Sequence, residues 1–289
     1  LFPDVAIQAG MIRLGPARRV LNRLTQWSLR HMDQIIVIGR CMERRLLRHG
    51  ISADKIVTIP NWADGHHISP LPRQENAFLA QHGLEGKFVI MYSGNHGIVH
   101  DFEGFVSLAI ATQSYPELRF CFIGDGAWRN QLIKVAKAEN WQHVLFLPYQ
   151  DRAVLRSSLT AADVHLVSLR NEMEGLSIPS KIYSVLAAGR PVIFFGPANS
   201  EPAAILREAQ CGFTVNPGDA EAAVQALLAV YKDRSLLEKQ GQAARLYFNR
   251  RFDRNIATQN FHQVFQRVAM SSPAHGLQRA PLSPPSKVA

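Results

Sequence analysis

Short apolar runs that alternate with helical patterns constrain this chain most strongly. From residue 88 onward, continuous apolar runs are separated by segments with helical spacing. Runs without polar alternation are typical of strands buried on both faces, and such strands alternate with helices in parallel sheets. The sequence therefore predicts an α/β fold with a Rossmann-like parallel sheet. The predicted strands are Phe88–Tyr92, Arg119–Ile123, Val144–Leu147, Val164–Val167, Val192–Phe195 and Gly212–Val215.

Helical segments separate and follow these strands. Apolar residues recur in them at i, i+3, i+4 and i+7, the spacing of one helix face. Residues 271–289 are rich in Pro, Ser and Ala and hold few large apolar groups, which predicts a disordered tail. The predicted helices are 101–114, 128–139, 151–161, 180–188, 201–209, 219–231, 235–249 and 254–269.

The front of the chain has too few elements to form a domain by itself. Its pattern predicts two short strands, Gln34–Ile38 and Lys55–Ile59, and two helices, Ala17–Arg30 and Arg40–His49. Such a piece cannot bury a core of normal domain size. We therefore expect the last part of a first Rossmann-like domain whose beginning is absent. The predicted division is 1–64 for this part, 65–84 for a linker, 85–252 for the second domain, 253–270 for a crossover helix and 271–289 for the tail.

The chain is basic, and the excess lies at the front. Its net charge is +9, and residues 1–60 hold ten Lys and Arg against four Asp and Glu. An anionic membrane surface or a nucleotide phosphate fits this charge. Nucleic acid is disfavoured, because aromatic residues do not interleave with the basic ones and no recognition motif is present.

The helix predicted at 17–30 has two interpretations. Val20, Leu24 and Trp27 form an apolar stripe, and arginines lie largely off it. The favoured interpretation is a helix packed on its own domain. The alternative is a basic amphipathic helix that contacts a membrane surface. The expected location is the cytoplasm, with the inner face of the plasma membrane as a site of peripheral contact.

Neither the cysteines nor the histidines predict a metal site. Cys41, Cys121 and Cys211 lie far apart and form no CxxC pair, which fits a reducing compartment. His96 and His100 have i, i+4 spacing, but His96 lies in a glycine turn and the segment is not HExxH. We therefore expect no metal and no bound cofactor.

Residues 172–193 carry the strongest functional signal. They predict a strand exit, a glycine loop, a short helix capped by Ser180 and ended by Gly189, and a new buried strand. Glu174, Ser180 and Lys181 then converge at a strand-to-helix crevice, where open α/β sheets bind ligands. A lysine at a helix N-terminus suits a phosphate, because free N–H groups and the helix dipole both favour an anion. The alternative is an ordinary strand-to-helix connection.

Four further segments follow strands of the same predicted sheet. Because the carboxyl ends of parallel strands meet at one edge, these segments together predict a nucleotide-type site there. Glycines allow close backbone approach to a ligand, and the polar residues supply hydrogen bonds. The candidate residues are Gly94, Asn95, His96 and Gly97 after the first strand, Gly124 and Gly126 after the second, Tyr149 after the third and Glu201 after the fifth.

The order and spacing of these pieces resemble the C-terminal half of GT-B glycosyltransferases. The resemblance is to family 4, the retaining group 1 enzymes of bacterial polysaccharide synthesis, of the capsule, O-antigen and colanic-acid type. It covers roughly residues 1–268. The matching segments are 59–64, 92–95, 123–126, 162–166, 174–176, 179–181 and 187–193.

This resemblance implies retaining transfer of a hexosyl group from a UDP- or GDP-sugar, without metal. The second domain would hold the donor and the first a glycan or lipid-linked acceptor. Glu174 would hold hydroxyls of the donor sugar. The sugar and diphosphate would be lined by the amides of Gly175, Leu176 and Ser177 and by the Gly94–Gly97 turn, and the base by the strand end at 147–149.

The sequence departs from the family pattern at two places. Many members carry Arg and Lys just after the first strand of the second domain, where this chain has Asn95 and Asp101. Lys181 is therefore expected to supply the positive charge. Many members carry a second glutamate for the ribose, where this chain has Ser184. The alternative function is a catalytically inactive nucleotide-sugar binding module.

Overall fold

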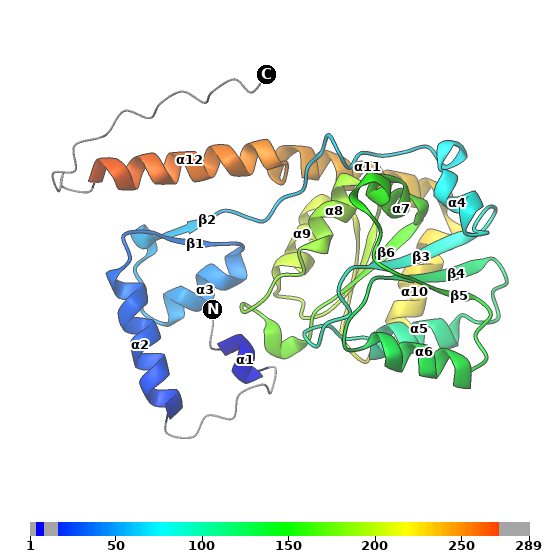
Figure 1. The fold of residues 1–289 in the computed structure, drawn as a ribbon, viewed down its shortest axis with the longest axis horizontal. Coiled ribbons are helices and arrows are strands. Elements are labelled where there is room, and N and C mark those ends of the chain that lie inside the picture. The colour runs from blue at the N-terminus through cyan, green and yellow to red at the C-terminus, as the bar shows by residue number, and fades with distance from the viewer. Residues whose placement is uncertain (1–3, 9–16, 272–289) are drawn as a thin grey trace, which may run out of the picture.

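A six-stranded parallel sheet forms the centre of the computed structural model, which describes residues 4–8 and 17–271 (Figure 1). The strand order is β5-β4-β3-β6-β7-β8. The chain builds outward from β3 in one direction, then returns beside β3 and builds in the other, so the topological switch point lies between β3 and β6. The six predicted strands are confirmed to within one residue at each end. They are β3 (Phe88–Ser93), β4 (Leu118–Ile123), β5 (Val144–Leu147), β6 (Val164–Ser168), β7 (Val192–Phe195) and β8 (Gly212–Val215).

Alternate residues of each strand pack on opposite faces of this sheet. On β3, Ile90 and Tyr92 belong to one core cluster, and Val89 and Met91 belong to another. Burial on both faces explains why the strand sequences show no polar alternation. One face is covered by α5 (Glu103–Ala111), α6 (Arg129–Ala138) and α10 (Ala220–Lys232). The other is covered by α4 (Ala77–Gln81), α7 (Leu155–Ala161), α8 (Lys181–Ala187), α9 (Glu201–Ala209) and α11 (Arg234–Arg251).

The front unit has no core of its own. It forms a two-stranded parallel sheet with helices beside it, as predicted, and Cys41, Met42 and Leu46 share one buried cluster with Ile182 and Leu206 of the larger unit. The front unit therefore packs against α8 and α9. Its elements are α1 (Asp4–Gln8), α2 (Ala17–His31), β1 (Ile35–Val37), α3 (Arg40–Arg48), the 3₁₀ turn η1 (Ala53–Lys55) and β2 (Ile56–Thr58).

The last helix, α12 (Arg254–Ser271), crosses from the larger unit back over β1 and β2 (Figure 1). Ala257 and Val264 on this helix pack with Ile59 at the end of the front sheet, and Phe261 joins them. The sequence pattern predicts a helix at 254–269, and the family resemblance implies that it crosses back onto the first domain. Beyond Ser271, the predicted tail lies outside the described residues.

The segment predicted as a linker, 65–84, contains more structure than expected. A 3₁₀ turn, η2 (Arg73–Glu75), leads into α4, whose Phe78 and Leu79 are buried against Val89 and Met91 of β3. The prediction missed α4 because a helix of five residues is too short to show a period. Likewise, the helix predicted at 151–161 begins as the 3₁₀ turn η3 (Arg152–Val154) before α7.

Arginines from the larger unit fix the rest of this linker. Arg245 donates to the carbonyl oxygens of Gly65 (3.0 Å) and Ile68 (2.8 Å), and Arg156 donates to Ser69 (3.1 Å) and Pro70 (2.9 Å). Backbone carbonyl groups in a connecting segment normally bind water, so these hydrogen bonds make the linker part of the larger unit.

None of the helices that the structure describes combines the length and the apolar character needed to span a membrane.

Asp163, just before β6, has a buried carboxylate. Its side chain is 5% exposed and accepts hydrogen bonds from Val89 N (2.8 Å), Arg73 Nη1 (3.0 Å) and Arg234 Nη1 (3.2 Å). We expect Asp163→Asn to lower the free energy of unfolding by about 2–4 kcal/mol, because the half-buried Arg73 loses its charged partner and the buried acceptor of three hydrogen bonds is weakened. Urea denaturation measures this. The matched control is Glu117→Gln, which breaks a more exposed ion pair with Lys87 and should cost less than about 1 kcal/mol; equal losses would contradict the prediction.

Candidate functional site

The switch point brings together segments that are far apart in sequence. β3 pairs with β4 on one side and with β6 on the other. The turn after β3 (94–97) therefore lies beside the turn after β4 (124–126), and the start of α8 packs on it. The structure thus gathers Gly94, Asn95, Gly124, Gly126 and Lys181 of the predicted site into one place.

The two glycine turns touch through their backbones. A Cβ atom at Gly124 would collide with the carbonyl oxygen of Gly94, and one at Gly126 would lie 2.8 Å from the carbonyl oxygen of His96. Gly94, Gly124 and Gly126 also have φ values of +134°, +124° and +142°, which residues with side chains rarely adopt. Glycine is required here both by close approach and by backbone conformation.

Lys181, the first residue of α8, reaches across to β3. Its Nζ donates a hydrogen bond to the hydroxyl of Tyr92 and lies 3.6 Å from the centroid of that ring. Its Cε lies 3.2 Å from the position of a Cβ at Gly94. Desolvation by burial lowers the pKa of Lys181 well below its usual range. None of the ion pairs found among residues 4–8 and 17–271 involves Lys181.

The histidines of this region are buried and uncharged at neutral pH. Burial, followed by repulsion from Lys181, lowers the pKa of His96 and of His100 to about 4. His100 Nδ1 donates to the carbonyl oxygen of Ser168 (2.7 Å), whereas neither ring nitrogen of His96 has a partner. The His96 ring stacks on Phe102 in the core, so this residue faces the turn through its backbone, where its N–H donates to Asp125 O (2.8 Å).

Tyr149 borders the same turns. Its side chain is exposed, and its hydroxyl donates to the carbonyl oxygen of Asp125 (3.3 Å). Its ring lies against the position of a Cβ at Gly124. An exposed aromatic face at a strand end can stack on a planar ring such as a nucleotide base.

Glu174 lies in a loop that packs on the front unit. It follows the 3₁₀ turn η4 (Asn171–Met173) and lines a cavity of about 380 Å³ between α3 and α9. The neighbouring Gly175 has φ +70°, and a Cβ there would lie 3.0 Å from the carbonyl oxygen of Cys41. The glycine therefore allows the Glu174 loop to pack on α3 of the front unit.

The cavity beside Glu174 is rich in arginine. Glu201 is 6% exposed and accepts from the backbone N (2.7 Å) and Nε (3.0 Å) of Arg40. Arg40 also pairs with Glu208 on α9. In this structure Glu201 thus joins the front unit to α9, and its predicted role in donor binding stays a prediction. Arg40, Arg44, Arg48 and Arg207 line the cavity with Glu174, Glu201 and Glu208.

The helix that starts at Lys181 is not capped as predicted. Ser180 is exposed and makes no side-chain capping bond, because its own backbone is already helical. The amides of Leu176 and Ser177, expected to face a ligand, donate to the carbonyl oxygen of Met173 (3.0 and 3.1 Å). Gly189 ends α8 with φ +66°, as predicted.

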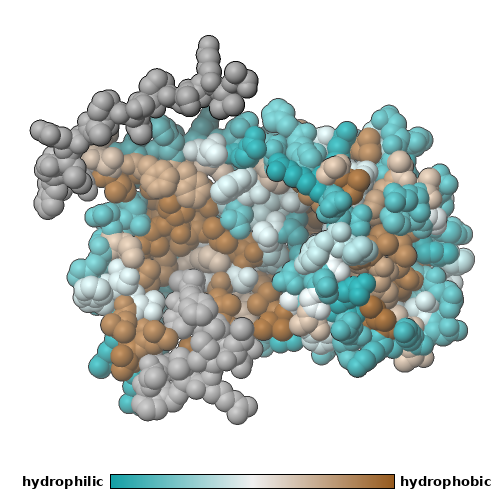
Figure 2. Space-filling view, viewed as in Figure 1, coloured by the Kyte–Doolittle hydropathy of each residue, from teal (hydrophilic) through white to brown (hydrophobic). Residues whose placement is uncertain are grey.

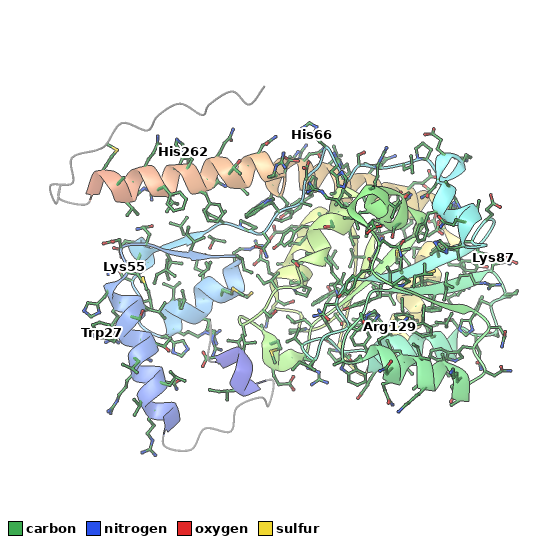
Figure 3. All side chains as sticks on the ribbon, in the orientation of Figure 1. Trp27, Lys55, His66, Lys87, Arg129 and His262 are labelled. Atoms are coloured by element: carbon green, nitrogen blue, oxygen red, sulfur yellow. The ribbon has the colours of Figure 1, made fainter. Side chains whose placement is uncertain are left out.

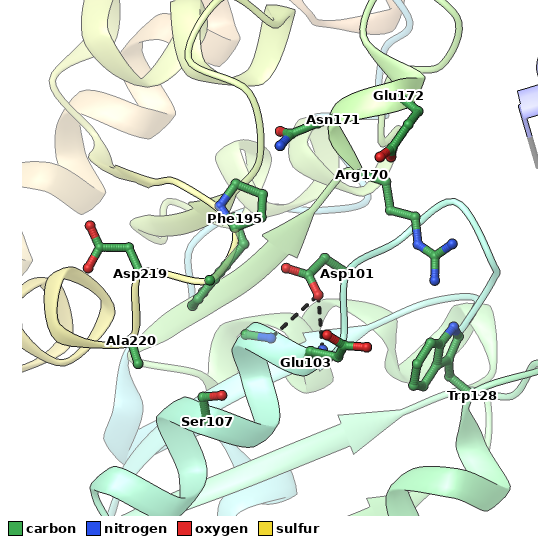
Figure 4. A pocket seen from close by; sticks show the side chains of 13 residues that line it. Asp101, Glu103, Ser107, Trp128, Arg170, Asn171, Glu172, Phe195, Asp219 and Ala220 are labelled. Carbon is green, nitrogen blue, oxygen red and sulfur yellow. Dashed lines mark hydrogen bonds between the residues drawn. The ribbon is translucent and has the colours of Figure 1, made fainter.

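Another cavity, of about 450 Å³, lies at the same edge of the sheet on the α5 and α10 side (Figure 4). No residue of the predicted site lines it. Asp101 lies in its wall and accepts from Glu103 N (3.0 Å) and Gly104 N (3.4 Å), which caps α5. Trp128 and Arg170 face the same space, with further carboxylates from Glu172 and Asp219.

Sequence reasoning assigned no role to Tyr92 or to Arg40. Tyr92 ends an otherwise apolar strand, and a buried tyrosine normally needs a partner for its hydroxyl, which was the available signal. Arg40 begins a helix in a basic segment, and nothing in its local pattern names a partner 161 residues away. Only the tertiary contact identifies it.

The contact between the glycine turns is testable by stability. We expect Gly124→Ala to lower the free energy of unfolding by about 2–4 kcal/mol, since it adds a collision to the cost of a positive φ. Gly86→Ala is the matched control, with φ +69° and nothing within 4 Å, and should cost only about 1 kcal/mol. Chemical denaturation compares the two variants. Equal losses would mean that the turns have room to separate.

Comparison with known proteins agrees with this architecture. The family model described as glycosyl transferases group 1 matches residues 74–247, and a glycosyl transferase 4-like domain matches residues 4–62. A probable glycosyltransferase of Pseudomonas aeruginosa, WbjE, is 31% identical over 76% of this chain and 55% of its own length. The putative colanic acid biosynthesis glycosyl transferase WcaI of Escherichia coli K12 is 26% identical over 89% of this chain and 64% of its own length.

Solved structures show the same fold. HepE of Anabaena, crystallised in complex with UDP-glucose, superposes with a TM-score of 0.74 at 14% identity, covering 88% of this chain and 70% of HepE. This similarity and the strand order identify the GT-B architecture. The chain spans 55% and 64% of the lengths of the two curated relatives named above. The family model matches more than half of the chain, and the chain belongs to the group 1 glycosyltransferases.

Proposed function

We propose that this chain carries the donor site of a retaining glycosyltransferase. The enzyme transfers a hexosyl group from a UDP- or GDP-sugar to a glycan or lipid-linked acceptor in bacterial surface polysaccharide synthesis. The observation that carries this proposal is Lys181, an amine with no carboxylate partner among the described ion pairs, next to two backbone turns that only glycine can form. A diphosphate is the anion that such a place suits.

The relatives support the substrate class. HepE binds UDP-glucose, and WcaI is named for colanic acid biosynthesis. Tyr149 follows β5 at the carboxyl edge of the sheet, and its exposed ring offers a face on which the nucleotide base can stack. We assign Glu174 to hydroxyls of the donor sugar, as in the family pattern.

The chemistry proceeds without a metal in this proposal. Departure of the nucleoside diphosphate places negative charge on the leaving oxygen, and Lys181 with nearby amides stabilises that charge as it develops. The leaving phosphate oxygen then accepts the proton of the acceptor hydroxyl. The glycosidic bond of the donor breaks and the new bond forms on the same face, which gives retention.

Two variants of the full-length protein test the donor site. Lys181→Ala is expected to reduce kcat/KM for donor hydrolysis or transfer about 10²–10³-fold, the usual loss when one transition-state donor is removed. Glu174→Ala is expected to reduce it about 10–100-fold through lost sugar contacts. Lys134→Ala, at an exposed lysine on α6, is the control. Near-normal kcat/KM in both site variants would contradict the assignment, whereas nucleotide binding without turnover in the wild type would favour the inactive binding module.

We further propose that α2 contacts an anionic membrane surface at the inner face of the plasma membrane. Val20, Leu24 and Trp27 are 60%, 56% and 63% exposed, and Trp27 lies on the outer side of the helix (Figure 3). Arg19, Arg23 and Arg30 are exposed beside them. Figure 2 shows apolar surface gathered over the front unit, below α12. A face with Trp, aliphatic and Arg side chains suits the headgroup region and would bring the enzyme to a lipid-linked acceptor.

Vesicle binding tests this contact. We expect co-sedimentation with vesicles that contain phosphatidylglycerol and little with neutral vesicles, and a loss of roughly 5-fold in affinity for each of Arg19→Gln and Arg23→Gln, from about 1 kcal/mol per charge. Trp27→Ala should also weaken binding. Leu246→Ala, which truncates an equally exposed side chain on α11, is the control. Equal binding by all variants would rule out α2 as the contact.

A further inference from the structure

Tyr92 joins the two parts of the donor site through a single hydroxyl. This oxygen accepts a hydrogen bond from Lys181 Nζ at the start of α8. It donates its one proton to the carbonyl oxygen of Asn95, 2.6 Å away, in the turn after β3. The ring is fully buried and packs on His96, Phe102 and Phe105, so the hydroxyl has a fixed position.

The direction of these bonds follows from chemistry. Lys181 as an ammonium has only donors, and a carbonyl oxygen has only acceptors. A protonated phenol is the group that can satisfy both at once. Burial raises the pKa of Tyr92 above its usual value, so the hydroxyl keeps its proton throughout the neutral range.

The surroundings of Lys181 otherwise disfavour its charge. The titratable and charged groups around it are His96 and His100 from the segment after β3, with Tyr149, Asp125 and Arg129 further out around Tyr92 and His96. The two histidines are neutral, and no described ion pair reaches Lys181. Among the described residues, the hydroxyl and the π face of Tyr92 are thus the contacts that stabilise the ammonium.

We propose that Tyr92 is a positioning residue, which holds the Lys181 ammonium and the Gly94–Gly97 turn in place for an anionic nucleotide. This inference rests on the proposed donor site and adds a residue to which no role has been given. Without the hydroxyl, the lysine keeps the ring contact but loses its acceptor, and the turn loses its only side-chain tie to β3 among the described hydrogen bonds. Preassembly of both groups lowers the cost of binding, because neither has to be ordered by the ligand.

The contact between Tyr92 and Lys181 predicts that nucleotide binding depends on pH. Lys181 has a lowered pKa in the free protein, and a bound diphosphate raises it again, so binding should weaken as pH rises through the free-state pKa. Tyr92→Phe removes an acceptor of the charged form and lowers the free-state pKa further. The pH midpoint of nucleotide binding should therefore move to lower pH in this variant.

The experiment is isothermal titration calorimetry of the full-length protein with UDP and with GDP between pH 6.5 and 9.5, which measures the binding affinity at each pH. Tyr92→Phe should weaken binding about 10-fold at pH 8, the usual loss for a hydrogen bond to a charged group, and lower the pH midpoint. Lys181→Met should remove the lysine-dependent part of the profile. Tyr183→Phe is the matched control, because it deletes a buried hydroxyl on α8 that has no hydrogen-bond partner among the described residues.

A second measurement does not depend on the nucleotide. Competitive acetylation of the nucleotide-free protein, followed by peptide mass spectrometry, gives the apparent pKa of Lys181, which should fall in Tyr92→Phe and stay constant in Tyr183→Phe. Unchanged acetylation and unchanged binding in Tyr92→Phe would overturn the inference, as would equal effects of the two tyrosine variants. If UDP and GDP bind to no variant and not to the wild type while acetylation still shifts, the proposed donor site fails and the link between Tyr92 and Lys181 stands.

Discussion

The pairing of β3 with β6 is the constraint on which the rest of the structure depends. It reverses the order in which strands are added, so the segments after β3 and β6 leave the sheet side by side. A crevice opens there because the connecting helices go to opposite faces. The glycine turns, η4 and the start of α8 are all placed by this single topological choice. A different strand order would leave the same residues at the sheet edge but not together.

The front unit depends on the same sheet in a different way. It shares its core with α8, α9 and α11, and it is joined to them by the bonds between Arg40 and Glu201. The chain passes between the units twice, and the two passages lie together at Ala63 and Asp253, where Ala63 N donates to Phe252 O (3.2 Å) and Arg254 N donates to Ala63 O (3.0 Å). The linker beyond this point is held by arginines of the larger unit.

Charge is sorted along the carboxyl edge of the sheet. Arginines gather on the side of the front unit, where Glu174 and Glu201 face them, and carboxylates gather at the cavity beside α5. Lys181 lies at the glycine turns with a tyrosine hydroxyl rather than a carboxylate as its acceptor. An unneutralised cation costs stability, and this arrangement keeps that cost where an anionic substrate would remove it.

The sequence by itself determined the layers and strands of the larger unit, and it predicted that the glycine turns and Lys181 lie at one edge of its sheet. Continuous apolar runs and helical periods have a direct physical cause in burial on one or both faces, and glycines after strands mark where backbones approach closely. What only the tertiary structure decided were contacts between distant residues. No local pattern names Lys181 and Asn95 as the partners of the Tyr92 hydroxyl, or Arg40 as the partner of Glu201. The burial of the His96 ring and the short helix α4 have no local signal either. Each is set by which elements pack together, because a side chain's partner depends on its position in space rather than on its neighbours in the chain.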